Sequence, residues 1–157
     1  MARRIEIDAI DMKILRELQS EGRMTNVELS ERVGISAPPC LRRVRKLEDA
    51  GVIEGYRAML NAPVLGYDLV AFCLVGLEHQ SDANLKAFAR RTDAWPLVRE
   101  AWMVSGETDF LLQCVAENLT QFQDFVIEEL TASENVETVR TMLTIRQVKD
   151  AGLVEFG

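Results

Sequence analysis

Residues 25–51 read TNVELSERVGISAPPCLRRVRKLEDAG. Two helix patterns follow one another in this stretch. Thr25 with Glu28 forms a capping box, which predicts the start of a helix that ends at Gly34. Ser36 begins the next helix, so only two residues separate the patterns. Two helices joined by a tight turn that contains glycine predict a helix-turn-helix.

The second of these helices, expected over 36–50, separates apolar from cationic side chains. Pro38 and Pro39 fit only in its first turn, where amide groups have no partner within the helix. At 100° per residue, one side consists of Cys40, Leu41, Val44, Leu47 and Glu48. The other consists of Pro38, Arg42, Arg45, Lys46 and Asp49, with Arg43 on the flank. Such a helix fits the major groove, where arginine binds guanine edges and phosphates. A solvated charged face is the alternative, and the short turn favours DNA.

A helix and a strand are expected on either side of this pair. Asp8 caps a helix through Ser20 that carries an apolar stripe at helical spacing. After Gly51, residues 52–60 are β-prone, which predicts the wing of a winged helix-turn-helix. Arg57 lies in this strand and is placed to contact the DNA backbone, although a plain surface arginine fits as well. The predicted DNA contacts are Ser36, Pro38, Pro39, Arg42, Arg43, Arg45, Lys46 and Arg57.

Charge is distributed unevenly along the chain. The net charge of −7 does not by itself suit a DNA-binding protein. Residues 1–60 carry 11 basic and 10 acidic side chains, a net of +1, whereas residues 61–157 carry 7 and 15, a net of −8. The acidity therefore belongs to the second half, and a basic patch compatible with the phosphate backbone remains in the first.

Composition and cysteine usage argue against several classes of protein. The longest apolar stretch, 69–77, is too short to span a bilayer, and the N-terminus lacks an apolar signal segment. We therefore expect a cytoplasmic protein with no membrane partner. Three scattered cysteines predict buried thiols rather than disulfides or a zinc site. With one histidine and no phosphate loop, we expect no catalytic residues, no metal and no cofactor.

The first half resembles the leucine-responsive/asparagine-synthase regulator (Lrp/AsnC) family. The matching blocks are Asp8-Ala-Ile-Asp11, Ile14-Leu15, Leu18-Gln19, Gly22-Arg23, Asn26-Val-Glu-Leu29, Val33-Gly-Ile-Ser36, Cys40-Leu-Arg-Arg-Val44, Leu47-Glu48, Gly51-Val-Ile53 and Gly55-Tyr56. One difference concerns the recognition helix, which usually opens Ser-Pro-Ser-Pro in the family. Here residues 36–39 read Ser-Ala-Pro-Pro, so a hydroxyl is absent at position 38. The resemblance implies a DNA-binding transcriptional regulator.

From Asp68 the pattern changes to alternating strands and helices. Strands are expected over 69–78, 97–104, 109–116 and 136–148, with helices after Ser81 and after Asn118 or Thr120. The order β-α-β-β-α-β predicts a ferredoxin-like unit. The first strand is apolar on both faces, and one layer of helices covers only one of them. We therefore expect a second subunit on the other face.

The second half resembles the ligand-sensing domain of the same family. The resemblance rests on Val104-Ser-Gly106-Glu-Thr-Asp109-Phe-Leu, where Glu107-Thr108 replaces the more usual Asp-Tyr. It implies an amino-acid effector near this turn, between the dimers of a ring such as an octamer. Gly106 would admit a carboxylate to backbone amides, and Asp109 would accept an ammonium group; a plain β-turn is the alternative. The predicted effector residues are Val104, Ser105, Gly106, Glu107, Asp109, Ser133 and Glu134.

These observations predict an α+β chain with two domains. A winged helix-turn-helix domain is expected over 1–60, a linker over 61–67, and a ferredoxin-like effector-binding and oligomerisation domain over 68–157. The partners expected are double-stranded DNA with a roughly palindromic operator and further copies of the chain. An enzyme or metabolite-binding module, and a chromatin-like architectural protein, are the alternative functions.

Overall fold

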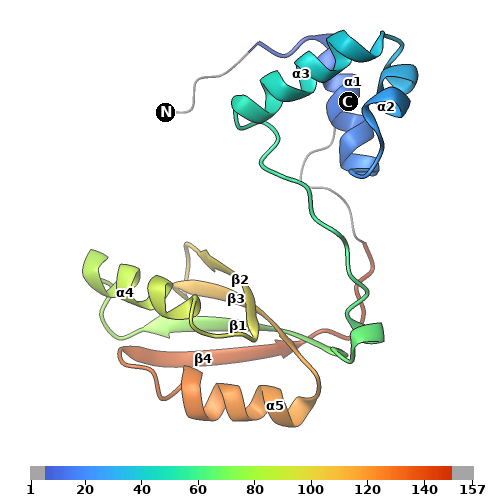
Figure 1. Ribbon diagram of the computed structural model, residues 1–157. Helices are drawn as coiled ribbons and strands as arrows, with labels where there is room; N and C mark the ends of the chain where they lie inside the picture. The colour runs from blue at the N-terminus through green and yellow to red at the C-terminus, as the bar shows by residue number, and fades with distance from the viewer. Residues whose placement is uncertain (1–5, 150–157) are drawn as a thin grey trace. The chain divides into compact units, whose positions relative to one another are not determined.

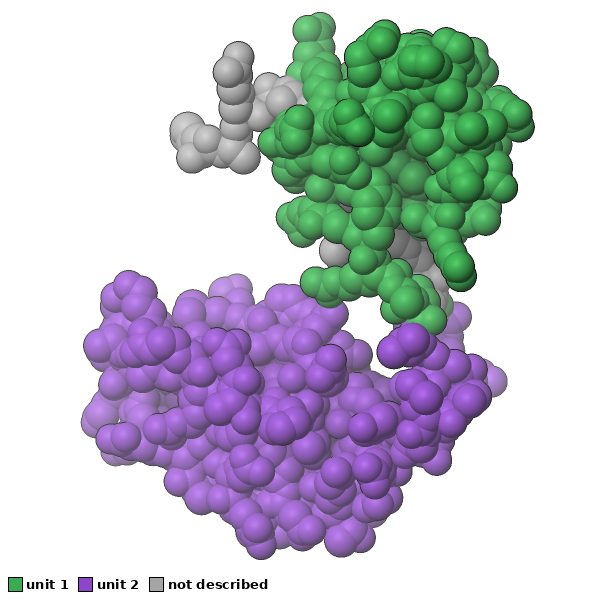
Figure 2. Space-filling model, viewed as in Figure 1, with its two compact units in different colours: residues 1–59, 149–157 green, residues 60–148 purple. Residues whose placement is uncertain are grey.

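The computed structural model of the chain describes residues 6–149. These residues form two compact units, one made of the chain up to Met59 together with Lys149, and the other of Leu60–Val148 (Figure 2). The outer limits expected for the two domains, residues 1 and 157, lie outside the described residues. Each unit has a hydrophobic core of its own.

Unit 1 is a three-helix domain (Figure 1). Its helices are α1 (Ala9–Ser20), α2 (Asn26–Val33) and α3 (Ala37–Asp49). Asp8 and Thr25 cap α1 and α2 as the sequence predicts, each within a capping box. The apolar stripes of the helices meet in one core, which consists of Ile14, Leu15, Leu29, Val33, Cys40, Val44 and Leu47.

The prediction of a strand over 52–60 is wrong. These residues form no strand after α3. A β-strand needs a neighbour to complete its hydrogen bonds, and no other strand lies in the described part of unit 1. A β-prone composition is therefore not sufficient here.

Unit 2 contains an antiparallel sheet, two longer helical segments and one short 3-10 helix. The strands are β1 (Leu69–Leu77), β2 (Val98–Met103), β3 (Phe110–Ala116) and β4 (Val136–Leu143), in the order β2-β3-β1-β4. The helix α4 (Asp82–Thr92) follows β1, and α5 (Leu119–Asp124) follows β3 and continues as the π-helical segment η2 (Phe125–Leu130). A short 3-10 helix, η1 (Pro63–Leu65), precedes β1. This is the β-α-β-β-α-β order that the sequence predicts.

Both helices cover the same face of the sheet. The core combines alternate residues of β1 and β3 with aromatic side chains of the helices, among them Phe88, Phe122 and Phe125. On the other face the side chains of these strands are only half buried, for example Phe72 and Leu111. The three cysteines are free and buried, and the Sγ atoms of Cys73 and Cys114 lie 3.9 Å apart.

The last strand is shorter than the expected 136–148. Its ladder with β1 ends at the pair Ala71–Leu143, and the Thr144 amide then donates to the Val70 carbonyl at 3.0 Å. Because β1 begins at Leu69, little of it remains to pair with residues after 144. The alternation of residue types continues past 143, but the ladder does not.

Candidate nucleic-acid interface and effector site

The N-terminus of α3 carries a serine that does not cap it. Ser36 adopts the extended N-cap conformation, but its side chain accepts no capping hydrogen bond. The reason is chemical, since a capping hydroxyl accepts from the second or third amide of the helix, and these positions are Pro38 and Pro39. The Ser36 hydroxyl is therefore available to an external partner. Ser36 and Pro38 are exposed, whereas Pro39 is partly buried.

The cationic side of α3 faces solvent. Arg42, Arg45 and Lys46 are exposed, while Cys40, Val44 and Leu47 hold the opposite side of the helix in the core. Three basic groups and the helix N-terminus thus share one accessible surface. Such an arrangement provides phosphate contacts and guanidinium groups that can pair with base edges.

Arg43 differs from its neighbours because carboxylates of the same unit surround it. Its Nη1 donates to Asp8 Oδ2 and to Asp11 Oδ1, each at 2.7 Å. Hydrogen bonds to Asp11 and then to Asp8 raise the pKa of Arg43. Of the basic residues predicted to contact DNA, this one is bound within unit 1.

The turn between α2 and α3 is held by local contacts. Gly34 ends α2 with φ of 84°, a conformation that glycine adopts readily. The Asn26 side-chain amide donates to the Ala37 carbonyl at 2.9 Å, which joins the start of α2 to the start of α3. The helix-turn-helix geometry is therefore specified by residues on both helices.

In the segment after α3, Tyr56 lies beside Gly22, just after the end of α1, and is 49% exposed. Its hydroxyl donates to Glu48 Oε1 at 2.9 Å, and burial and the Glu48 carboxylate raise the pKa of Tyr56 to about 12. Arg57 is exposed and lines a surface cavity of about 390 Å³ together with Arg23. Sequence reasoning did not predict that Arg23 would lie at the same surface cavity as Arg57, because the two residues are far apart in the chain.

The residues predicted to bind an effector lie at one end of the sheet. The hairpin between β2 and β3 closes with the Val104 amide donating to the Asp109 carbonyl at 2.9 Å. Gly106 has φ of 132°, and Ser105, Gly106 and Glu107 are exposed. The Asp109 carboxylate accepts from the Leu77 amide at 2.7 Å, next to an irregularity in the β1–β4 register. Asp109 thus also holds the end of β1.

Ser133 and Glu134 precede β4 and are brought to the same end through Asn135. The Asn135 side chain accepts from the His79 amide and donates to the His79 carbonyl, each at 2.9 Å. The loop after β1 therefore contacts both predicted segments, because its Gln80 side chain also approaches Asp109 at 3.5 Å. The Ser133 hydroxyl donates to the Glu129 carbonyl at 2.7 Å, and Glu134 is exposed.

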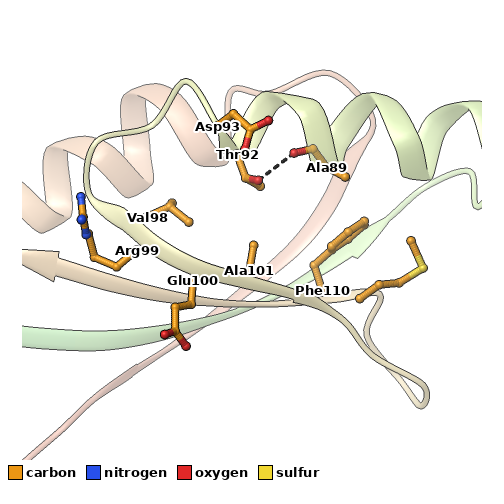
Figure 3. A pocket seen from close by; sticks show the side chains of 9 residues that line it. Ala89, Thr92, Asp93, Val98, Arg99, Glu100, Ala101 and Phe110 are labelled. Carbon is orange, nitrogen blue, oxygen red and sulfur yellow. Dashed lines mark hydrogen bonds between the residues drawn. The ribbon is translucent and has the colours of Figure 1, made fainter. Parts of the chain in front are cut away.

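A cavity of about 520 Å³ lies between α4 and β2 (Figure 3). Figure 3 shows Val98 and Ala101 directed toward α4, while Glu100 points to the opposite side of the strand. The Thr92 hydroxyl donates to the Ala89 carbonyl at 2.7 Å. None of the predicted effector residues lines this cavity, although Met103 and Phe110 flank their hairpin.

Two further features of residues 6–149 concern ions and membranes. Within this range no group of three or more histidine, cysteine, aspartate or glutamate side chains is arranged to hold a metal ion. No helix in the same part of the chain is long and apolar enough to cross a membrane.

The helix-turn-helix with an exposed basic helix, followed by a separate α/β unit, defines a class of two-domain DNA-binding regulators. Residues 7–54 match the family described as winged helix-turn-helix DNA-binding, and residues 70–154 match the Lrp/AsnC ligand binding domain. The chain belongs to the Lrp/AsnC family of transcriptional regulators. It is therefore a regulator with a ligand-binding domain and not an enzyme, as the sequence predicts.

Relatives extend over nearly the whole chain. The leucine-responsive regulatory protein of Rhizobium meliloti is 84% identical over 155 residues. The aligned residues cover 99% of this chain and 99% of the relative. The leucine-responsive regulatory protein of Escherichia coli K12 is 36% identical over 146 residues, which cover 93% of this chain and 89% of the relative. A transcriptional regulator of Neisseria meningitidis, solved as a complex with L-methionine, has 37% identity and a TM-score of 0.91, with coverage of 96% and 97%.

Proposed function

We propose that this regulator recognises DNA through α3, with Arg42, Arg45 and Lys46 on bases and phosphates. Ser36 and the prolines 38 and 39 would face the backbone at the helix N-terminus, and Arg57 would add a phosphate contact. The observation that carries the proposal is the exposed basic side of α3, whose opposite side is anchored in the core. Its DNA partner implies a cytoplasmic location.

We infer further that the binding species is at least a dimer. The half-buried face of the sheet in unit 2 is the surface for the second copy, and dimers would combine into a ring such as an octamer. Two symmetry-related α3 helices then require a roughly palindromic operator.

The effector is inferred to be an amino acid bound at the loop end of the sheet. Two solved relatives, from Neisseria meningitidis and from Mycobacterium tuberculosis, are complexes with L-methionine. The backbone amides of Ser105, Gly106 and Glu107, next to Val104, would hold the carboxylate. Asp109, Ser133 and Glu134 would surround the ammonium group. A thermal-shift screen with the twenty amino acids tests whether any of them stabilises the protein.

The experiment for the DNA proposal compares paired substitutions in the two units. Arg42→Ala with Arg45→Ala should abolish selective binding to the duplex that the wild-type protein selects from a random-sequence pool. On a shuffled duplex, the slope of log affinity against log salt should become shallower by about 0.9 for each phosphate that is no longer neutralised. Arg90→Ala with Lys86→Ala removes the same charge from α4 and should leave both properties unchanged. Unchanged binding by the α3 variant would remove this helix from its proposed role.

A further inference from the structure

Arg43 lies on α3 among residues that face DNA in the proposed function, yet it binds α1. Its Nη1 donates to Asp8 and Asp11 at 2.7 Å each, over separations of 35 and 32 residues. The Asp11 side chain is only 2% exposed, and that of Arg43 is 31% exposed. A buried carboxylate without its cation would be left uncompensated, so release of these two bonds in favour of a phosphate would be costly.

The two carboxylates also form the N-terminal cap of α1. Asp8 Oδ1 accepts from the amides of Ile10 and Asp11 at 2.9 Å each. Asp11 Oδ2 in turn accepts from the Asp8 amide at 3.3 Å. All four carboxylate oxygens therefore have partners, and the remaining two, Asp8 Oδ2 and Asp11 Oδ1, are those that bind Arg43. Arg43 thus joins the middle of α3 to a fixed point at the start of α1.

We propose that Arg43 is a positioning residue for DNA recognition, which sets the rotation of α3 on α1 and so aims Arg42 and Arg45. It does not contact DNA itself. This inference rests on the proposed role of α3. Since consecutive helical residues are 100° apart, a rotation of α3 would move the neighbouring guanidinium groups away from base edges while leaving the charge of the domain unchanged.

The chain offers a matched control in Arg32. Its guanidinium group also bridges two carboxylates, Glu17 at 3.3 Å and Glu21 at 2.8 Å. This pair joins α2 to α1 and does not involve α3. Arg32→Met therefore removes one charge and a double ion pair, as Arg43→Met does, without changing what holds the recognition helix.

The test uses the full chain, the duplex that the wild-type protein selects from a random-sequence pool, and a shuffled duplex of the same composition. We expect Arg43→Met to lower the ratio of affinities for the two duplexes about tenfold, the effect of one mismatched base pair. On the shuffled duplex, the slope of log affinity against log salt should be the same for Arg43→Met and Arg32→Met. The affinity ratio of Arg32→Met should match that of the wild-type protein. Circular dichroism melting confirms that binding is measured on folded protein.

Asp11→Asn gives a test of opposite electrostatic sign. Removing a negative charge should by itself strengthen binding to phosphate, whereas loss of the anchor should lower the affinity ratio. The double variant Arg43→Met with Asp11→Asn should be no worse than either single variant, because both remove the same interaction. Arg43→Lys keeps the charge and one donor nitrogen, and a single nitrogen of Arg43 makes both bonds. This variant should therefore retain more of the affinity ratio than Arg43→Met, with no change in salt slope.

Several results would overturn the proposal. A salt slope for Arg43→Met that is shallower by about one phosphate than for Arg32→Met would make Arg43 bind DNA directly. An unchanged affinity ratio for Asp11→Asn, or equal losses of affinity ratio for Arg32→Met and Arg43→Met, would also exclude positioning. If Arg42→Ala has no effect, the reading role of α3 fails as well; if Arg42→Ala weakens binding, only the role of Arg43 is in question.

Discussion

At the scale of single residues, polar groups that suit a ligand also serve the chain. Asp109 accepts the Leu77 amide where the β1–β4 register is irregular, so a residue predicted for the effector also stabilises a strand end. Its second carboxylate oxygen and its charge are what an ammonium group would use. The structural and the ligand-binding roles can therefore be separated by a substitution that keeps the shape and removes the charge.

Asp109→Asn should lose effector binding while the fold remains. The asparagine carbonyl oxygen can still accept from the Leu77 amide, but it lacks the charge that an ammonium group requires. Any amino acid that raises the melting temperature of the wild-type protein should therefore raise that of the variant much less. Asp124→Asn makes the same change at an exposed residue of α5 outside the predicted effector set and serves as the control. A full thermal shift in Asp109→Asn would assign the ammonium group to another residue.

The capping carboxylates of unit 1 make its stability depend on pH. The backbone hydrogen bond from Asp11, and then the bond to Arg43, lower the pKa of Asp8 from 3.8, and the Thr25 amide likewise lowers the pKa of Glu28 from 4.5. A carboxyl group whose pKa is lowered by folding stabilises the folded state above its unfolded pKa and ceases to do so as the pH falls through its folded pKa. The free energy of unfolding of unit 1 should thus fall below about pH 4.

Urea unfolding followed by the amide NMR signals of α1 would measure this dependence. Asp8→Asn removes one titrating group, so the stability of the variant should vary less steeply with pH over the acid range. An identical pH profile for the variant would exclude Asp8 as a source of the effect.

At the scale of secondary-structure elements, close approach of strands limits the choice of side chains. Gly76 of β1 is paired with Thr138 of β4, just before the irregularity in their register. A Cβ atom at Gly76 would lie 2.5 Å from Thr138 Oγ1. The absence of a side chain at Gly76 is therefore required by the neighbouring strand.

Gly76→Ala should destabilise unit 2 by about 1–3 kcal/mol, the usual cost of overpacking. Adding Thr138→Ala removes the clashing hydroxyl and should restore most of the stability, whereas Thr138→Ala alone should have a small effect. Urea unfolding followed by tryptophan fluorescence reports on this unit, because both tryptophans, Trp95 and Trp102, belong to it. If Gly76→Ala is as stable as wild type, rotation of the threonine is enough to relieve the clash.

At the scale of the whole molecule, one face of the sheet in unit 2 is covered by no helix of residues 60–148. Apolar side chains of all four strands lie on it, among them Phe72, Leu74, Trp102, Leu111 and Met142. We call this set the open face. Trp102 is 41% and Met142 48% exposed. A contiguous apolar surface of this kind is typical of an interface between subunits.

Trp102→Glu should dissociate the assembly, because it places a charge on the open face. Sedimentation velocity should show a smaller species over the range where the wild-type protein is oligomeric. Ile127→Glu is the matched control, since Ile127 is also an exposed apolar residue, at 66%, but belongs to η2 on the helical side. Equal dissociation by both variants, or by neither, would exclude the open face as the interface.

Much of the fold follows from short-range patterns. The caps at Asp8, Thr25, Ser81 and Asn118, and the periodicity of the helices, act over a few residues and are readable in the chain. The same holds for the apolar alternation of β1 and β3. The family resemblance rests on these blocks too, so the class of regulator was accessible from sequence.

The sequence by itself thus determined the order of the elements, the two-part organisation and a basic helix after a tight turn. Only the tertiary structure decided which polar groups remain available. Arg42 and Arg43 are adjacent and chemically alike, yet Arg43 binds carboxylates 32 and 35 residues earlier. Likewise, residues 52–60 have the composition of a strand but form none in the described part of unit 1, which holds no second strand. Local propensity acts through neighbours in the chain, whereas ion pairs and ladders depend on partners that folding brings together.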